Sequence, residues 1–177
     1  VGAGGADEGI APQLDRGRQA THRGEVDIGA DQHQGVEDRP VGAAQPQVTA
    51  IGLDERLSRC GAMRSALERV AGAVVDSAVA EAGQPRRFAR REMQSALGLL
   101  DALPDLAEAI RPVAVPATSG STRLEWAPYG VVLGWHAANS PVWVPTLVAA
   151  SALVAGNSVV CRPSTRVRRT TGLVLDA

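Results

Sequence analysis

The sequence predicts an α/β fold in which N-terminal helices precede the first strand–helix units of a parallel sheet. Two patterns predict it. Apolar residues recur at helical spacing between residues 53 and 110, and beyond residue 123 short, nearly continuous apolar segments alternate with longer helical ones. Such alternation is typical of parallel strands that are covered by helices. The 177 residues are enough for one domain and hardly for two.

The first 50 residues differ in composition from the rest of the chain. They scatter Gly, Gln, Asp and Arg, contain no Phe, Trp, Tyr or Met, and follow neither the helical nor the alternating period. We therefore expect residues 1–50 to be a disordered leader and residues 51–177 to form the domain. The alternatives for the leader are an arm that contacts a partner and a segment without function.

Three helices are predicted ahead of the sheet. The first begins near Leu53 and is stopped by Gly83, and its apolar face carries Met63, Leu67, Val70, Val74 and Ala78. The second covers about 86–102, and Pro104 opens a third, shorter helix that runs to about residue 110.

Strands and helices alternate in the second half of the chain. A proline-rich link at 112–116 and a Ser/Thr/Gly turn at 118–122 separate this half from the helices. Strands are predicted at 124–126, 130–133 and 158–162, and helices at 141–154 and 166–176. Ligands of parallel sheets bind beyond the carboxyl ends of the strands, so the loops at 134–140 and 163–165 are the candidate site.

Composition excludes several classes of function. The 18 basic and 19 acidic residues give a net charge of −1, which favours neither nucleic acid nor an anionic membrane as a partner. The apolar stretch 141–156 is shorter than the about 20 residues that a membrane span needs. Two cysteines and three histidines have no metal-binding spacing, so no metal is expected. We expect a cytoplasmic protein.

Three short motifs lie in and between the two candidate loops. They are Ala137-Ala138-Asn139-Ser140-Pro141, Ala155-Gly156-Asn157 and Val159-Val160-Cys161-Arg162-Pro163-Ser164-Thr165. They resemble the aldehyde dehydrogenase superfamily, whose members carry a Pro-Trp-Asn-Phe-Pro loop, a helix closing on Ala-Gly-Asn, and a Val-Val-Leu-Lys strand followed by Pro-Ser-Glu. Asn139 precedes Asn157 by 18 positions and Arg162 by 23, as in the family. The resemblance is specific over residues 129–169. It continues more weakly toward the N-terminus, so that it covers roughly residues 53–177.

The resemblance implies that residues 51–177 are the N-terminal part of a Rossmann-like cofactor-binding domain, which is incomplete here. Family members oxidise an aldehyde to a carboxylic acid with NAD(P)⁺, through attack of a cysteine thiolate on the aldehyde. The side-chain amide of the loop asparagine holds the resulting oxyanion, and Asn139 matches that residue. An uncharged hydrogen-bond donor that is held in place can stabilise the negative charge that develops on the oxygen without reorganising during the step. Alternatively, Asn139 only turns the chain between strand and helix.

By the same resemblance, Arg162, Ser164 and Thr165 would bind the cofactor ribose or its phosphate, and the main chain of His136, Ala137 and Ala138 would line the same cleft. Family members usually have lysine at the position of Arg162 and a ribose-binding glutamate at that of Thr165. A hydroxyl in place of the carboxylate would not repel a 2′-phosphate, so of NAD and NADP we expect NADP to be tolerated or preferred. Alternatively, Ser164 and Thr165 cap a helix.

Two departures from the family pattern matter. Ala138 and Ser140 replace the Trp and Phe beside the loop asparagine, which bears on cofactor affinity. The nucleophilic cysteine and the general-base glutamate of the family lie in sequence beyond Ala177, so we expect a fragment of an enzyme. Cys60 and Cys161 are expected to be structural.

Three interpretations remain open at this point. The chain is part of an aldehyde-oxidising enzyme, or a non-catalytic remnant that acts as an NAD(P)-binding or interaction module. The third is part of a CoA-acylating reductase of the same fold. The partner expected for the full-length protein is an aldehyde substrate. An incomplete sheet exposes an apolar edge, so we also expect marginal stability and self-association into a homo-oligomer.

Overall fold

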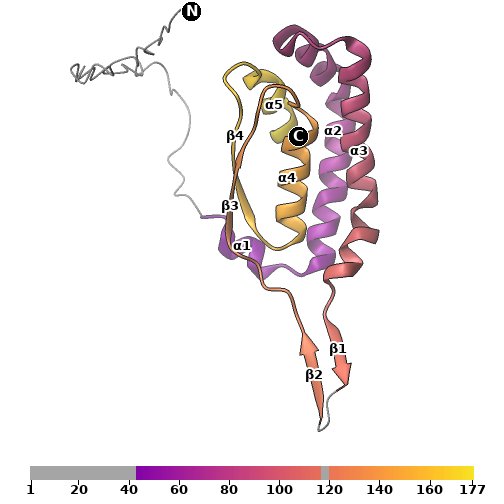
Figure 1. Ribbon diagram of the computed structural model, residues 1–177, viewed down its shortest axis with the longest axis vertical. Coiled ribbons are helices and arrows are strands. Elements are labelled where there is room, and N and C mark those ends of the chain that lie inside the picture. Colours follow the sequence, from indigo (N-terminus) through magenta and orange to yellow (C-terminus); the bar gives the residue numbers. More distant parts are fainter. Residues whose placement is uncertain (1–42, 117–119) are drawn as a thin grey trace, which may run out of the picture. The chain divides into compact units, whose positions relative to one another are not determined.

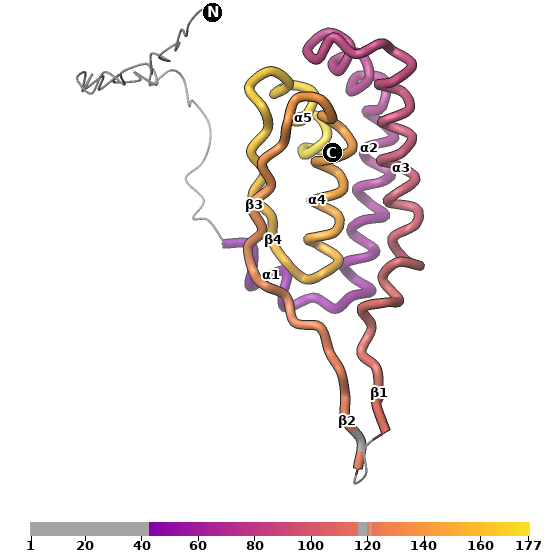
Figure 2. The backbone as a smooth tube through the Cα atoms, viewed as in Figure 1, coloured from indigo at the N-terminus to yellow at the C-terminus, as the bar shows by residue number. Residues whose placement is uncertain are grey.

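Two long helices form one side of the domain. The computed structural model describes residues 43–116 and 120–177, and in it α2 (Leu53–Ala82) and α3 (Arg86–Ala107) run antiparallel beside each other (Figures 1 and 2). Gly83 ends α2 with a φ of +64°, a left-handed conformation that glycine adopts without strain. The first predicted helix is confirmed. Its buried side chains, together with those of α3, form most of the core, and these include Cys60, Leu67, Val74, Ala78, Ala89, Met93, Ala96 and Leu100.

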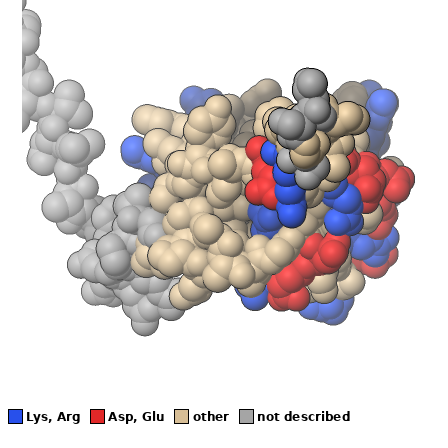
Figure 3. Space-filling view, turned by 90° about the horizontal axis from the view of Figure 1, so that it is seen from below, with Lys and Arg blue, Asp and Glu red and all other residues tan. Residues whose placement is uncertain are grey.

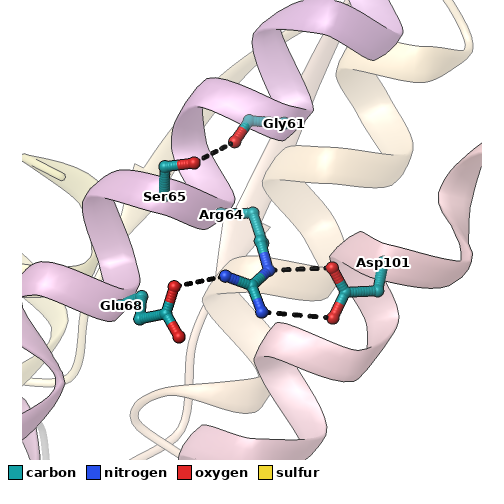
Figure 4. A network of polar contacts seen from close by, with 5 residues as sticks. All are labelled: Gly61, Arg64, Ser65, Glu68 and Asp101. Atoms are coloured by element: carbon teal, nitrogen blue, oxygen red, sulfur yellow. Dashed lines mark hydrogen bonds and ion pairs between the residues drawn. The ribbon is translucent and has the colours of Figure 1, made fainter.

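Polar contacts between α2 and α3 lie at the rim of this core (Figure 4). Nε of Arg64 donates to Oδ1 of Asp101 at 2.8 Å and Nη2 to Oδ2 at 3.5 Å, while Nη1 pairs with Glu68 one turn along α2. Because the two carboxylates are exposed, each pair contributes at most about 1 kcal/mol. The apolar core therefore holds the helices together, and Arg64 helps to set their orientation.

Helix α3 continues through Pro104, where the sequence predicted a break between two helices. This prediction was wrong because Leu100, Leu103 and Ala107 stay buried on one face across the proline. Burial of that face against α2 outweighs the hydrogen bond that the proline ring removes. Only beyond Ala107 does the helix tighten, into the short 3₁₀ turn η1 (Glu108–Ile110).

A β-hairpin follows, where a proline-rich link and a turn were predicted. Strands β1 (Val113–Pro116) and β2 (Ser121–Leu124) pair antiparallel, with Val113 opposite Leu124, and project beyond the helices (Figure 1). The strand predicted at 124–126 is thus displaced toward the N-terminus. Pro116 is tolerated because it ends its strand, where a missing N–H costs least. The predicted turn at 118–122 falls partly outside the described residues.

Two parallel strands form the other side of the domain. β3 (Val131–Trp135) and β4 (Ser158–Arg162) pair in register from Val131 opposite Ser158 to Trp135 opposite Arg162, and α4 (Trp143–Val154) connects them. Helix α4 lies between this pair and the α2–α3 pair (Figure 1). The predicted parallel strand–helix–strand order, and with it the α/β class, is confirmed.

Only one face of the strand pair is covered by the described helices. Along β3, Gly134 is buried on the side of α4, while the alternating residues Val131, Leu133 and Trp135 are exposed on the other side. In Figure 3, seen from below, acidic and basic residues gather on one side, and much of the remaining visible surface is uncharged. The expectation of a sheet covered by helices therefore holds for one face of the described structure.

A short helix precedes α2, inside the segment expected to be a leader. In α1 (Gln45–Ala50), the side chain of Gln45 accepts a hydrogen bond from the Ser158 amide at 2.6 Å and donates one to the Gly156 carbonyl at 2.9 Å. These bonds tie α1 to the start of β4, so residues 45–50, which were expected to be disordered, form a helix that contacts the domain. Residues 1–42 lie outside the described residues, and so does the prediction made for them.

The last helix is anchored by a carboxylate of α2. The amides of Arg169 and Thr170, in the first turn of α5 (Arg168–Leu175), donate to Glu81 at 3.1 and 2.7 Å. Burial raises the pKa of Glu81, but these bonds and that from the Thr170 hydroxyl outweigh it, and the net effect lowers the pKa below its ordinary value. None of the helices in the described ranges is both long and apolar enough to cross a membrane.

Replacing Gly156 by alanine is expected to lower the free energy of unfolding by about 1–3 kcal/mol. Gly156 has a φ of +83°, and a Cβ there would press on the Arg56 guanidinium and lie 3.4 Å from Cβ of Pro128. Urea unfolding followed by circular dichroism measures the change. Gly72→Ala, within α2 and with no atom near its new Cβ, is the control and should not destabilise. Equal midpoints for the two variants would contradict the expectation.

Candidate functional site

The two predicted loops lie side by side at the carboxyl ends of β3 and β4. Strand β3 and its pairing extend into the predicted loop 134–140, because the amide of His136 still donates to the Arg162 carbonyl at 3.0 Å. The chain then diverges into residues 137–142 on one side and 163–167 on the other. The topology thus brings both candidate loops to one edge, as expected for parallel strands.

Asn139 lies on the surface of the first loop, facing the start of α3. Its carbonyl accepts a hydrogen bond from Nε2 of Gln84 at 3.2 Å, and its side-chain amide makes no hydrogen bond to the part of the chain that is described. An open groove of about 540 Å³ separates the loop from α3. Its walls include Gln84, Phe88, Arg91, Asn139, Ser140 and Trp143.

Glu92 holds this loop, a role that its place in the sequence did not predict. Its Oε1 accepts hydrogen bonds from the Ser140 hydroxyl at 2.8 Å and from the amides of Val142 at 2.9 Å and Trp143 at 2.8 Å. Its Oε2 accepts one from Nε2 of Gln84 at 3.2 Å. The loop residues lie about fifty positions from Glu92 in the sequence, so no local pattern could have indicated the contact.

His136 points into the protein, although its main chain was expected to line a cofactor cleft. Its side chain is 1% exposed, and neither ring nitrogen has a hydrogen-bond partner among the described residues. A Cβ at Gly134 would lie 2.8 Å from its Nε2, so only glycine leaves room for the ring. Burial lowers the pKa of His136 below its ordinary value of 6.5. Ala137 is exposed and Ala138 half-buried.

The stability of the protein is expected to fall as the pH decreases below about 6.5, because of His136. The unfolded chain protonates this histidine near its ordinary pKa, whereas the folded protein resists protonation, so acid favours unfolding over that interval. Urea midpoints between pH 7.5 and 5.5 measure the slope. His136→Leu should flatten it, and profiles of unchanged slope would show that His136 does not cause the pH dependence.

The second loop presents Arg162, Ser164 and Thr165. The Arg162 guanidinium stacks on the Trp135 ring, 4.7 Å from its centroid, and pairs with no carboxylate among the described residues. Ser164 accepts a hydrogen bond from the Arg166 amide at 3.3 Å, and Thr165 is exposed. The alternative of a helix-capping pair was wrong, because α5 begins only at Arg168 and Glu81 binds its first amides.

The two cysteines are poorly suited to nucleophilic chemistry. Cys60 is buried within α2 and Cys161 is partly buried in β4, and burial raises the pKa of both thiols. Cys161 is less enclosed than its apolar strand had suggested. In residues 43–116 and 120–177, no three His, Cys, Asp or Glu side chains lie together as metal ligands would.

A parallel β-α-β unit backed by a helical pair, with polar loops beyond the carboxyl ends of its strands, is part of a Rossmann-like α/β fold, in which ligands bind at those ends. The aldehyde dehydrogenase family model matches residues 39–177, which is most of the chain. The chain therefore belongs to the aldehyde dehydrogenase family, and the resemblance in the three motifs is confirmed. The match includes α1.

Solved structures of the family share the fold. Lactaldehyde dehydrogenase from Escherichia coli is 21% identical with a TM-score of 0.70, and the match covers 77% of this chain and 29% of that protein. An NAD-dependent benzaldehyde dehydrogenase from Corynebacterium glutamicum is 23% identical with a TM-score of 0.66, covering 76% and 29%.

A third structure, an aldehyde dehydrogenase from Physcomitrella patens in complex with its reaction product succinate, is 20% identical with a TM-score of 0.68, covering 76% and 29%. At these identities the likeness concerns the fold. The chain thus spans less than a third of the length of these relatives. No curated protein sequence matches it significantly.

Proposed function

We propose that this chain contributes the oxyanion-binding asparagine and part of the NAD(P) site to an enzyme that oxidises an aldehyde to a carboxylic acid. The observation that carries the proposal is the meeting of both motif-bearing loops at one edge of the β3–β4 pair, in a chain of this family. Asn139 and Arg162 extend from the ends of neighbouring strands. The substrate of the whole protein would be an aldehyde.

Asn139 would donate its side-chain amide to the oxygen of the aldehyde as negative charge develops there. The amide is exposed at the groove and makes no bond within the described chain, so it is available for a ligand. A neutral donor held in place needs no reorganisation, and one such donor typically lowers a barrier by about 3 kcal/mol. The chain's own contribution to the reaction is this placement.

The residues at the end of β4 fit a phosphate-bearing cofactor. Arg162 has no carboxylate partner among the described residues, its planar group is supported by Trp135, and the hydroxyls of Ser164 and Thr165 follow it. A guanidinium fork beside hydroxyls matches phosphate oxygens. NAD(P)⁺, when bound, would accept the hydride. Because Thr165 carries no charge, we propose that NADP binds at least as well as NAD.

A non-catalytic NAD(P)-binding module is the second candidate function. It requires only the loops at the carboxyl ends of β3 and β4, which this chain contains, and neither of its two thiols. Sequencing the DNA after codon 177 in all three frames separates the candidates. A downstream segment with the family's cysteine and glutamate supports the enzyme, and its absence supports the module. For either candidate we also propose a cytoplasmic location and self-association.

Titration of the chain with NADP and with NAD tests the cofactor site. Trp135 contacts Arg162, so binding of either nucleotide beside these two residues should change the tryptophan fluorescence. We expect saturable changes with both nucleotides, with NADP at least as tight. No change at millimolar nucleotide would overturn the proposed site, and tighter binding of NAD would overturn the preference.

A further inference from the structure

We propose that Glu92 is a positioning residue that fixes the loop bearing Asn139, and the inference rests on the function proposed for Asn139. The carboxylate lies on α3, while the loop belongs to the β3–α4 connection. It touches no reacting atom. Its effect would be to hold the donor of Asn139 in one place, which is what stabilisation of a developing charge requires.

The first half of the argument is the start of α4. The first amides of a helix lack partners within it, and α4 has no side-chain cap of its own. Oε1 of Glu92 binds the amides of Val142 and Trp143 and the hydroxyl of Ser140, all within 2.9 Å. A carboxylate is also favoured by the positive end of the helix dipole. Glu92 thereby fixes the chain directly after Asn139.

The second half is Gln84, in the turn between α2 and α3. Its Nε2 donates both to Oε2 of Glu92 and to the carbonyl of Asn139, each at 3.2 Å. The network therefore holds the main chain at Asn139 itself as well as at the three residues bonded to Oε1. Gln84 and Glu92, from one end of the helical pair, thus bind the loop at Asn139 and directly after it.

Glu81 offers a matched comparison within the same protein. It binds the amides of Arg169 and Thr170 at the start of α5, as Glu92 binds those at the start of α4, and it makes no bond to the Asn139 loop. Both carboxylates come from the end of the helical pair that contains Gln84. Loss of either should lower stability. Glu92 binds the loop directly, whereas Glu81 is linked to it through α5, where the Thr171 hydroxyl donates to the Pro141 carbonyl at 3.3 Å, so loss of Glu92 should release the loop more.

Amide hydrogen exchange on the full chain, measured by NMR, tests the proposal. In Glu92→Ala the amides of Val142 and Trp143 should exchange about tenfold faster, beyond any change in the slowest core amides. Glu92→Gln keeps one acceptor oxygen and should restore most of this protection. Glu81→Ala, whose link to the loop runs through α5, should raise the exchange of both amides much less than Glu92→Ala does. The side-chain amide signals of Asn139, identified by their loss in Asn139→Ser, should shift in Glu92→Ala and in Gln84→Ala.

Two outcomes would overturn the inference. One is that exchange at Val142 and Trp143 rises no more in Glu92→Ala than in Glu81→Ala. The other is that the Asn139 signals stay unchanged in Glu92→Ala or in Gln84→Ala. If Glu92→Ala does not fold, the Asn139 signals of Gln84→Ala, compared with those of the wild type, decide. These measurements require no nucleotide. The role of Glu92 can therefore be confirmed when the cofactor titration fails, and it can be overturned when the titration succeeds.

Discussion

Leu67→Ala is expected to lower the free energy of unfolding by about 3 kcal/mol, because it removes a large side chain from the centre of the core. Leu67 is 0% exposed and lies in the core cluster that α2 and α3 share with α4. Truncation removes its burial and leaves a cavity that two rigid helices cannot close. Urea unfolding followed by circular dichroism measures the loss.

Leu106→Ala is the matched control, because Leu106 lies on α3 with 59% of its surface exposed. Its effect should stay within about 0.5 kcal/mol. Similar losses for the two variants would contradict the assignment of the core to the α2–α3 interface. Because the described helices leave one face of the β3–β4 pair uncovered, the total stability is expected to be small, and Leu67→Ala is then expected to be largely unfolded at 37 °C.

The elements that the sequence predicted correctly are those with a strong internal pattern. Helix α2 repeats its buried residues at helical spacing over thirty residues, and β4 is an apolar run with clear ends. For such segments, the pattern of burial is contained in the segment itself. The parallel pairing followed from the order of the elements, since a helix between two strands returns the chain in the same direction.

The errors fall where a distant segment decides the structure. Helix α1 is held by bonds from Gln45 to residues more than a hundred positions away, and β1 becomes a strand only through its pairing with β2. Pro104 stays inside α3 because the residues around it pack against α2. In each case, tertiary contacts override the local preference.

The candidate site divides in the same way. Parallel topology and motif spacing located both loops, so the placement of Asn139 and Arg162 at one edge could be predicted. The side chain of His136 is buried because Gly134 leaves space for it beside α4. The hydrogen bonds of Glu92 to the loop join residues of two separate elements. Periodicity carries no information on such contacts.

Arg162→Gln is expected to weaken NADP binding about 10- to 100-fold, because a charge-assisted bond to a phosphate contributes roughly 1.5–3 kcal/mol. The guanidinium is held against the Trp135 ring at 4.7 Å and lacks a carboxylate partner in the described part of the chain, so it does not need to break an ion pair to bind. Glutamine keeps a donor but loses the charge and the fork. Fluorescence titration measures both nucleotides.

NAD lacks the 2′-phosphate, so Arg162→Gln should change its affinity by less than about threefold, the range expected for loss of a neutral contact at an exposed site. Arg59→Gln removes the same charge from α2, where Arg59 pairs with Glu55, and should affect neither nucleotide. Equal weakening of NAD and NADP by Arg162→Gln would show that the guanidinium binds a group that both share, such as the ribose or the pyrophosphate. Any preference for NADP over NAD would then have to come from Thr165, which stands where family members usually have a glutamate. Thr165→Glu would be the variant that reverses this preference.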